Sequence, residues 1–267
     1  MIIIGEKING SIPSVAKAIE ERDTAFLQEL AEKQSAAGAD FIDVCASVPE
    51  KREAETLKWM IEAVQEVTDT PLAVDSPSPE ILREMLPHCN SAGLVNSVSL
   101  EGDKIDIIFP AIADTKWECV ALLCDDSGIP KTAKKRLEIF EAIMDKAKTY
   151  GIAPGRIHID PLVEMLCASE DGIETVTETI REIKKRYPSV HVTGAASNIS
   201  FNLPASKYVN QGFMILAMNA GMDSAILDPL NADMMGLIYA AEALLGEDEY
   251  CIEYINAYRD GLFGNVK

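Results

Sequence analysis

Eight short apolar segments recur along this chain, and nearly all of them end in a carboxylate or carboxamide side chain. A helix-like stretch follows each segment, which is the pattern of eight strand–helix units. In a closed parallel barrel the carboxyl ends of the strands meet at one face, where such folds carry their active sites. The sequence therefore predicts a (β/α)8 or TIM barrel whose mouth is ringed by Glu6, Asp43, Asp75, Asn96, Asp125, Asp160, Asn198 and Asp228.

The length of 267 residues fits one such barrel, so we expect a single domain over residues 1–267. Strands that alternate with helices of this length imply crossover units and a parallel sheet. An open doubly wound sheet is the competing architecture, but no GxGxxG motif follows the first strand. Segments leaving the strands, such as KINGSIPSV, read as long functional loops. Helices are predicted over 23–37, 53–67, 79–86, 104–113, 132–150, 172–187, 207–220 and 233–245, with an extra C-terminal helix over 249–261.

The charge balance excludes two classes of partner. A net charge of -19, from 43 acidic and 24 basic residues, repels nucleic acid and anionic lipid, which are bound mainly through Lys and Arg. No apolar run reaches the roughly 18 residues of a membrane span, and the first residues lack the basic n-region of a signal peptide. Six cysteines without CxxC spacing suit reduced core thiols. We therefore expect a soluble cytoplasmic protein with no membrane or nucleic-acid partner.

Four of the strand-end residues suit the recognition of a polar heterocycle. A carboxylate accepts two parallel hydrogen bonds from an adjacent ring N–H and exocyclic amine, which is the edge of an aminopyrimidinone. An Asn amide both donates and accepts, so it complements the carboxylate. Asp75, Asn96, Asp160 and Asn198 close the third, fourth, sixth and seventh strands. Any one of them could instead cap the following helix or stabilise a turn, but a coincidence at four strand ends favours a binding role.

The histidines and cysteines of this sequence are not spaced as metal ligands. Of the three histidines, neither His88 nor His191 is expected at the mouth of the barrel. His158 alternates with isoleucines before Asp160, so it either points inward or is an ordinary strand histidine. No second His or Cys stands at a workable spacing for zinc, so we predict no bound metal.

Nucleophilic catalysis and phosphate binding are also disfavoured. Cys45, Cys124 and Cys167 have no obvious histidine to act as a base. Cys45 and Cys124 lie at strand ends and could touch a ligand, although small buried thiols are the preferred interpretation. The loop after the seventh strand has no glycine-rich nest, and Gly194 alone is too little for a phosphate site.

The order of the strand-end motifs resembles a known family. GEKING, IDV, LAVDS, LVNSVS, IDPL, GAASNISFNLP and FMILAMNAGMDSAILDP are similar to the methyltetrahydrofolate–corrinoid methyltransferases. These are pterin-binding barrels related to the folate-binding module of cobalamin-dependent methionine synthase. The likeness covers essentially the whole chain in order.

The resemblance implies roles for individual residues. Asp75, Asn96 and Asp160 would hold the pterin ring, and Asn198 would lie beside the folate nitrogen that carries the methyl group. Asn198 is thereby the expected catalytic residue. Less specific matches near the pocket complete the candidate set: Ser197, Gly194, Glu6, Asp43, Cys124 and Asp228.

The resemblance also implies an activity and its partners. The expected reaction moves a methyl group between a corrinoid (cobalamin) carried by another protein and N5 of tetrahydrofolate, with transfer from methylcorrinoid to tetrahydrofolate favoured. The family is generally dimeric, so a homodimer is expected. Small members of the family pass on a methyl group that a separate enzyme removes from a substrate such as glycine betaine, and a role in such a system is expected here.

The chain departs from the family pattern in three places. Cys45 replaces an Asn of the second-strand motif, and the fifth strand ends in Cys124, Asp125 and Asp126 instead of a Met-Asn type sequence. After the SN motif some relatives have an Arg, where this chain has Ser206 and Lys207. The pterin contacts should survive these changes, whereas contacts to the corrinoid partner or to the folate tail are less secure.

Three alternatives remain open. Dihydropteroate synthase shares the barrel and the pterin, but it needs basic residues for diphosphate, and the nearest to the SN motif is Lys207. A non-catalytic folate-binding or corrinoid-docking subunit would bind folate without turnover. An unrelated barrel, such as a metal-dependent hydrolase, would contain stoichiometric metal.

Overall fold

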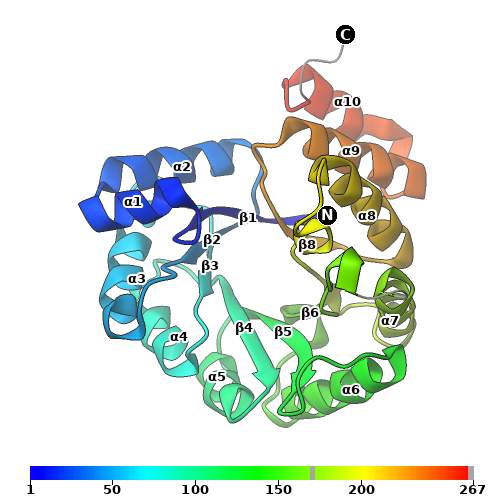
Figure 1. The fold of residues 1–267 in the computed structure, drawn as a ribbon, viewed down its shortest axis with the longest axis horizontal. Coiled ribbons are helices and arrows are strands. Elements are labelled where there is room, and N and C mark those ends of the chain that lie inside the picture. Colours follow the sequence, from blue (N-terminus) through cyan, green and yellow to red (C-terminus); the bar gives the residue numbers. More distant parts are fainter. Residues whose placement is uncertain (169–171, 264–267) are drawn as a thin grey trace.

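The eight strands form one parallel barrel. The computed structural model describes residues 1–168 and 172–263. Its strands are paired in the order β7-β6-β5-β4-β3-β2-β1-β8, and helices surround them (Figure 1). The barrel closes where Ile226 N donates to Gly194 O at 3.0 Å and Ala196 N donates to Ile226 O at 3.1 Å. The strands are β1 Ile2–Asn9, β2 Phe41–Cys45, β3 Leu72–Asp75, β4 Leu94–Leu100, β5 Glu118–Asp125, β6 Ile157–Asp160, β7 His191–Val192 and β8 Ser224–Leu227.

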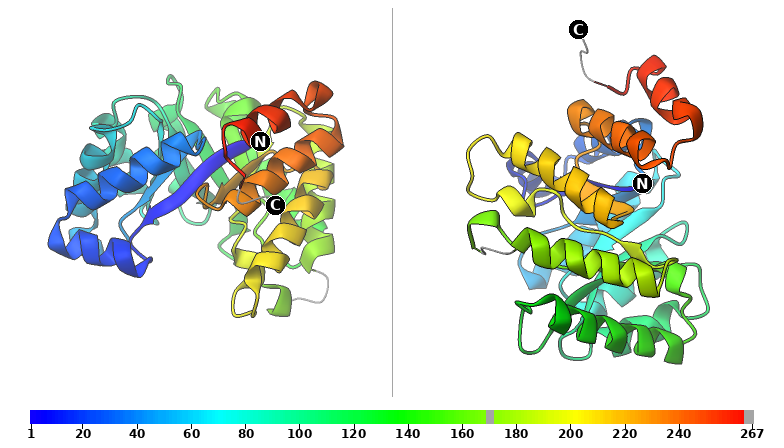
Figure 2. Two further views of the ribbon diagram at one scale, coloured as in Figure 1. Left: turned by 90° about the horizontal axis from the view of Figure 1, so that it is seen from above. Right: turned by 90° about the vertical axis from the view of Figure 1, so that its right-hand side faces the viewer.

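The helices cover the outside of the barrel. Figure 2 shows α6 to α10 stacked in chain order along one side of the molecule, from green to red. The α-helices are α1 Pro13–Glu21, α2 Thr24–Ala36, α3 Glu50–Gln65, α4 Pro79–Met85, α5 Lys104–Ile112, α6 Ala133–Thr149, α7 Gly172–Arg186, α8 Ser206–Ala220, α9 Ala232–Leu245 and α10 Ile252–Arg259. Short 3-10 turns are η1 Leu86–His88, η2 Pro154–Arg156, η3 Leu166–Ala168, η4 Asn198–Ser200 and η5 Glu249–Cys251.

The predicted barrel with an extra C-terminal helix is confirmed, but several elements differ from the prediction. β1 runs past Glu6 to Asn9, and β4 runs past Asn96 to Leu100. The KINGSIPSV segment is predicted as a loop, but it contains the end of β1 and the first residues of α1, where Pro13 opens the helix and Val15 packs into the core. The seventh strand was expected to run to Asn198, yet β7 ends at Val192. The segment after it pairs with β8 only through an isolated bridge between Ala195 and Ile226, which frees Asn198 to turn toward the mouth.

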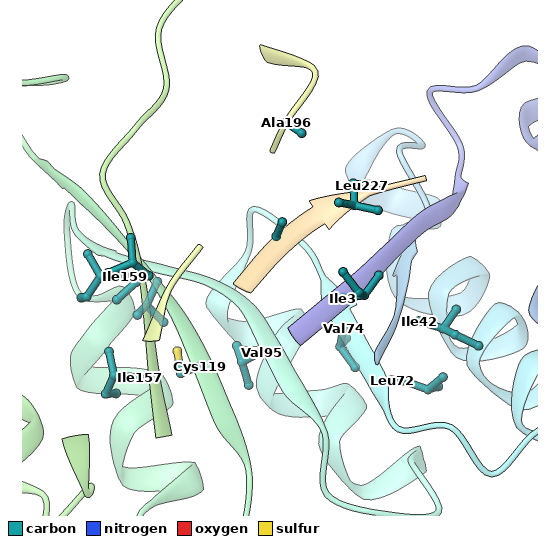
Figure 3. Close-up of a cluster of buried hydrophobic side chains, with 14 of the residues drawn as sticks. Ile3, Ile42, Leu72, Val74, Val95, Cys119, Ile157, Ile159, Ala196 and Leu227 are labelled. Atoms are coloured by element: carbon teal, nitrogen blue, oxygen red, sulfur yellow. The ribbon is translucent and has the colours of Figure 1, made fainter. Parts of the chain in front are cut away.

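Alternation along the strands divides the core into two layers. Ile3 packs between the barrel and its helices, whereas Ile4, the next residue, belongs to a small cluster with Ala73, Leu94 and Val120. Successive strand side chains point to opposite faces, so this division follows directly from the apolar strand sequences. Figure 3 shows the outer layer, in which Ile3, Ile42, Val74 and Val95 among others come from successive strands.

The remote end of the barrel holds the histidine that sequence left ambiguous. His158 is buried, its Nε2 lies 2.7 Å from Glu118 Oε2, and its Nδ1 lies 3.1 Å from Ser224 Oγ. Glu118 and Ser224 begin their strands, so this network lies away from the mouth. Burial lowers the pKa of His158, which favours the neutral ring. His158 therefore faces inward as a structural residue.

Metal-binding clusters and membrane-spanning helices are absent from the described residues. Across 1–168 and 172–263, no cluster of three or more His, Cys, Asp or Glu side chains is arranged to hold a metal ion. None of the helices in the same part of the chain combines the length and apolarity needed to span a bilayer.

Candidate active site

A cavity of about 400 Å3 opens at the carboxyl ends of the strands. Side chains from β1, β2, β3 and β4 and from the segment after β7 meet in it, as expected for a parallel barrel. Six of the candidate residues therefore lie together, although they are far apart in sequence: Glu6, Asp43, Asp75, Asn96, Ser197 and Asn198. The remaining lining residues are Asn9, Ser11, Ile12, Ala195 and Ile226.

Strand register brings the central polar groups into contact. Asp75 on β3 pairs with Cys45 on β2 and with Asn96 on β4. Asp43 precedes Cys45 by two residues, so it faces the same side of the sheet. Asn96 Nδ2 donates to Asp43 Oδ1 at 3.0 Å, which joins β4 to β2 across the end of β3.

Burial makes the cavity carboxyls hold protons more tightly than usual. Burial, with a contribution from Asp228, raises the pKa of Glu6 to about 7, although Lys7 opposes the shift. Burial raises the pKa of Asp75 to about 6, with a hydrogen bond from Cys45 opposing and the charge of Glu53 adding to the shift. These groups can therefore exchange protons with a ligand near neutral pH.

Asp43 is the most deeply buried of these acids. Burial and then the charge of Asp75 raise the pKa of Asp43 well above its usual value, against the hydrogen bond from Asn96. Two carboxyls this close do not both ionise readily, so Asp43 and Asp75 titrate as a pair in which the second ionisation is disfavoured. Asp43 is the more buried partner, so the fold favours its protonated form more strongly than that of Asp75.

Sequence reasoning missed the residues contributed by the last part of β1. Asn9 Oδ1 accepts hydrogen bonds from Ser11 N at 2.9 Å and from Ser47 Oγ at 3.2 Å. The register between β1 and β2 shifts between Gly5 and Ile8, so simple alternation does not predict which residues reach the cavity. The second glycine of the GEKING motif, Gly10, was the available sign that the chain passes close to another backbone segment here. In the structure a Cβ added to Gly10 would lie 2.0 Å from the carbonyl oxygen of Ala46.

Cys45 belongs to the same polar rim. Its Sγ lies 3.2 Å from Ser47 Oγ, and burial raises the pKa of the thiol above its usual value. A thiol that resists ionisation is a poor nucleophile. Cys45 therefore lies beside Asp75 as an uncharged neighbour, outside the lining of the cavity.

Asp160 lies in a neighbouring cavity of about 320 Å3. Asn198 lines both cavities, so it lies where the Asp160 cavity meets the cavity of the Asp43–Asp75 group. Asp160 Oδ1 accepts from Leu162 N at 2.7 Å. Burial raises the pKa of Asp160 to about 6, although that hydrogen bond and the charge of Arg136 both lower it. The second cavity is lined by Ile129, Asp160, Leu162, Val163, Glu164, Met165, Asn198 and Phe201.

Three remaining candidates lie outside the described linings of these cavities. A Cβ added to Gly194 would lie 3.8 Å from Asp160 Oδ1, so this glycine lies next to the Asp160 side chain. Cys124 is buried, and burial raises the pKa of its thiol to about 11. Asp228 lies 3.2 Å from Lys7 Nζ and influences the cavity through the charge it presents to Glu6. Direct ligand contacts by these three residues stay predictions.

The barrel and its polar mouth define a class of protein with known structures. Dihydropteroate synthase from Xanthomonas albilineans, solved in complex with 7,8-dihydropteroate, superposes with a TM-score of 0.66 over 93% of each chain. Its sequence identity is 18%, so it shows the shared fold alone. The sequence profile of the family described as "Pterin binding enzyme" matches residues 8–228, and the chain belongs to this family.

Two curated relatives narrow the comparison. "Methylcorrinoid:tetrahydrofolate methyltransferase" from Eubacterium limosum is 50% identical over 269 residues, which is 100% of this chain and 99% of that protein. "Methionine synthase" from Mycobacterium tuberculosis is 32% identical over 241 residues, covering 85% of this chain but 20% of that protein. The family resemblance expected from the strand-end motifs is thus confirmed.

Proposed function

We propose that this protein is a methyltransferase that moves a methyl group from a methylated corrinoid protein to N5 of tetrahydrofolate. One observation carries the proposal. A chain that is 50% identical over its whole length to a methylcorrinoid:tetrahydrofolate methyltransferase gathers Asp75, Asn96 and Asn198 at one cavity of about 400 Å3. A cavity of this size and polarity suits a reduced pterin.

The pterin edge would be held by the three residues that the resemblance assigns. A charged Asp75 can accept two parallel hydrogen bonds from a ring N–H and an exocyclic amine. Asn96 gives its amide donor to Asp43, so its carbonyl oxygen remains available to a ligand donor. Asp160 uses Oδ1 for Leu162 N, which leaves Oδ2 for the pterin.

Asn198 would act at the reacting nitrogen. The N5 lone pair attacks the methyl carbon in line as the cobalt–carbon bond breaks, cobalt keeps the bonding electron pair, and the methylated nitrogen then loses its proton. The Asn198 amide can hydrogen-bond this nitrogen and orient its lone pair, but an amide is not a strong acid or base. The proton would therefore leave through a water held by Asp75 or Asp160, whose pKa values are both raised to about 6.

The methyl donor would come from a separate subunit. The corrinoid carried by that protein supplies the methyl chemistry, and this chain supplies binding and orientation. The departures at Cys45, Cys124–Asp126 and Ser206–Lys207 lie at positions where partner or folate-tail contacts are expected to vary. A substrate demethylase of the glycine betaine type is the proposed source of the methyl group, inherited from the resemblance.

A homodimer is also proposed, formed through the outer face of α8 and α9. The two helices pack side by side (Figure 2) and bound an apolar groove of about 340 Å3. Leu216 on α8 is 51% exposed and Leu244 on α9 is 87% exposed. Burying these side chains against a second copy would remove the groove from water.

The dihydropteroate synthase alternative lacks a positive group at the cavities. Neither lining contains Lys or Arg among the described residues. Lys207 pairs with Asp233, and Lys7 pairs with Asp228. A diphosphate leaving group would therefore meet carboxylates with no clamp to neutralise it.

The decisive experiment mixes the protein with tetrahydrofolate and a methylated corrinoid protein. Stopped-flow spectra would report loss of methyl-cobalt(III), and chromatography would report 5-methyltetrahydrofolate in equal amount. Folate binding by calorimetry without any turnover would instead support the non-catalytic subunit, and stoichiometric metal by elemental analysis would support the hydrolase reading.

A further inference from the structure

An arginine is buried beside the candidate active site without a complete set of partners. Arg136 on α6 is 1% exposed. Its Nε donates to Pro130 O at 3.3 Å, and its Nη2 donates to Glu164 Oε2 at 3.5 Å. Nη1 is buried and has no hydrogen-bond partner in the described part of the chain. Burying a guanidinium costs free energy unless its charge and its N–H groups are matched by partners, and the match is incomplete at Nη1.

The same arginine joins two loops that frame the second cavity. Pro130 lies between β5 and α6, and Glu164 lies after β6. Lys131 reinforces the link from the solvent side, because its Nζ donates to Glu164 Oε1 at 2.6 Å. The loops so joined supply Ile129 on one side of the cavity and Leu162 on the other.

Arg136 also supplies positive charge to Asp160. Of the ionisable groups around Asp160, Arg136 is the one whose charge acts against burial to lower the pKa of that carboxyl. Glu164 pairs with the guanidinium, and Lys131 pairs with Glu164. Glu6, Asp43 and Asp75 line the other cavity. Without Arg136, the hydrogen bond from Leu162 N would be left to oppose burial, and the neutral acid would be favoured more strongly.

We infer that Arg136 is a positioning residue for the folate site, which fixes the two loops and keeps the Asp160 carboxylate charged so that it can accept the donors of the pterin edge. The inference rests on the proposed folate function and deepens it. It assigns a role to a side chain that touches neither cavity directly.

The test is the pH dependence of tetrahydrofolate binding, measured by calorimetry between about pH 5 and 9. Tight binding requires the charged form of Asp160. Affinity is therefore retained above the pKa of Asp160 and is lost as the pH falls through that pKa. In Arg136→Met the midpoint of this loss should rise by about one pH unit or more, which lowers the charged fraction at the wild-type midpoint from one half to about one eleventh and so weakens binding about fivefold there. Arg136→Lys keeps the charge and should restore the midpoint.

Two further variants separate charge from structure. In an Asp160→Asn background the remaining pH dependence comes from Asp75, and Arg136→Met should not move its midpoint, because the group on which Arg136 acts is gone. Arg156→Met is the matched control. Arg156 is a partly buried arginine away from the mouth of the barrel, and its Nε donates to Trp117 O at 2.8 Å. It should alter thermal stability and leave the midpoint unchanged.

Glu164→Gln keeps the test decisive if Arg136→Met fails to fold. Removing this negative charge leaves Arg136 less neutralised, so the midpoint should move to lower pH, opposite to Arg136→Met. An unchanged midpoint in Arg136→Met, or a raised one in Glu164→Gln, overturns the inference. Absence of tetrahydrofolate binding by the wild-type protein would instead overturn the proposed function.

Discussion

Asn96 Nδ2 donates a 3.0 Å hydrogen bond to Asp43 Oδ1 at the mouth of the barrel. Because Asn96 Nδ2 is engaged by this contact, the Asn96 carbonyl oxygen is the atom available to a ligand. The deeply buried Asp43 thus orients the Asn96 amide. Asp43 therefore shapes the site through Asn96, and need not touch a ligand itself.

Asp43→Asn should stabilise the protein at neutral pH. A carboxyl whose pKa is raised by folding stabilises the fold below its unfolded pKa and loses that contribution as pH rises. The neutral amide keeps an oxygen for Asn96 and does not ionise, so Tm should increase by roughly 2–4 °C per kcal/mol gained. Calorimetric scans at pH 7.5 should show the gain, and scans below pH 4 should show none; an equal gain at both would exclude ionisation as its cause.

Asn198→Ala should reduce the rate of methyl transfer far more than folate affinity. Losing a hydrogen-bonding group at the reacting atom typically costs on the order of 100-fold in rate. Single-turnover stopped-flow traces would give the rate and calorimetry the Kd for tetrahydrofolate. Asn90→Ala, an exposed amide before β4, is the control. Parallel losses in rate and affinity would reassign Asn198 to binding.

Asp75→Asn should weaken tetrahydrofolate binding. Hydrogen bonds to a charged group contribute about 1.5–3 kcal/mol, so a loss of roughly tenfold or more in Kd is expected. Wild-type affinity should also fall as pH drops below about 6, because Asp75 is then protonated. Calorimetry would measure both effects, and unchanged affinity in the variant would remove Asp75 from the pterin edge.

Leu244→Glu should prevent dimer formation. The introduced charge would have to be buried at the proposed α8–α9 interface, where it has no designated partner. Light scattering after size-exclusion chromatography would give the mass of each variant. Ala153→Glu, an exposed position between α6 and β6, should leave the mass unchanged. A Leu244→Glu protein that stays dimeric would place the interface elsewhere.

Much of the barrel was predictable because its signal is local. The alternation that puts Ile3 and Ile4 in different core layers is written in the strand sequences. Helix α1 was missed because Asn9, Gly10 and Pro13 are typical turn residues, and the proline instead occupies the first helical turn.

The residues of the site could be predicted from the sequence, but their distribution over two cavities could not. Strand ends converge in any closed parallel barrel, so Asp75 and Asn96 could be brought together from sequence. The separation of Asp160 into a second cavity depends on how the segment after β7 bends, which periodicity does not encode. Arg136 escaped notice because a charged residue on a helix is normally solvated, and its burial depends on two distant loops.

Asn198 lines both cavities, at the place where they meet. A compound built to straddle that one side chain, with a pteridine head on one side and an apolar group on the other, would occupy both compartments at once. The selectivity of such an inhibitor would come from apolar contacts with Ile129 and Phe201 in the second cavity, whereas its pteridine head would contact the carboxyl groups of the first cavity.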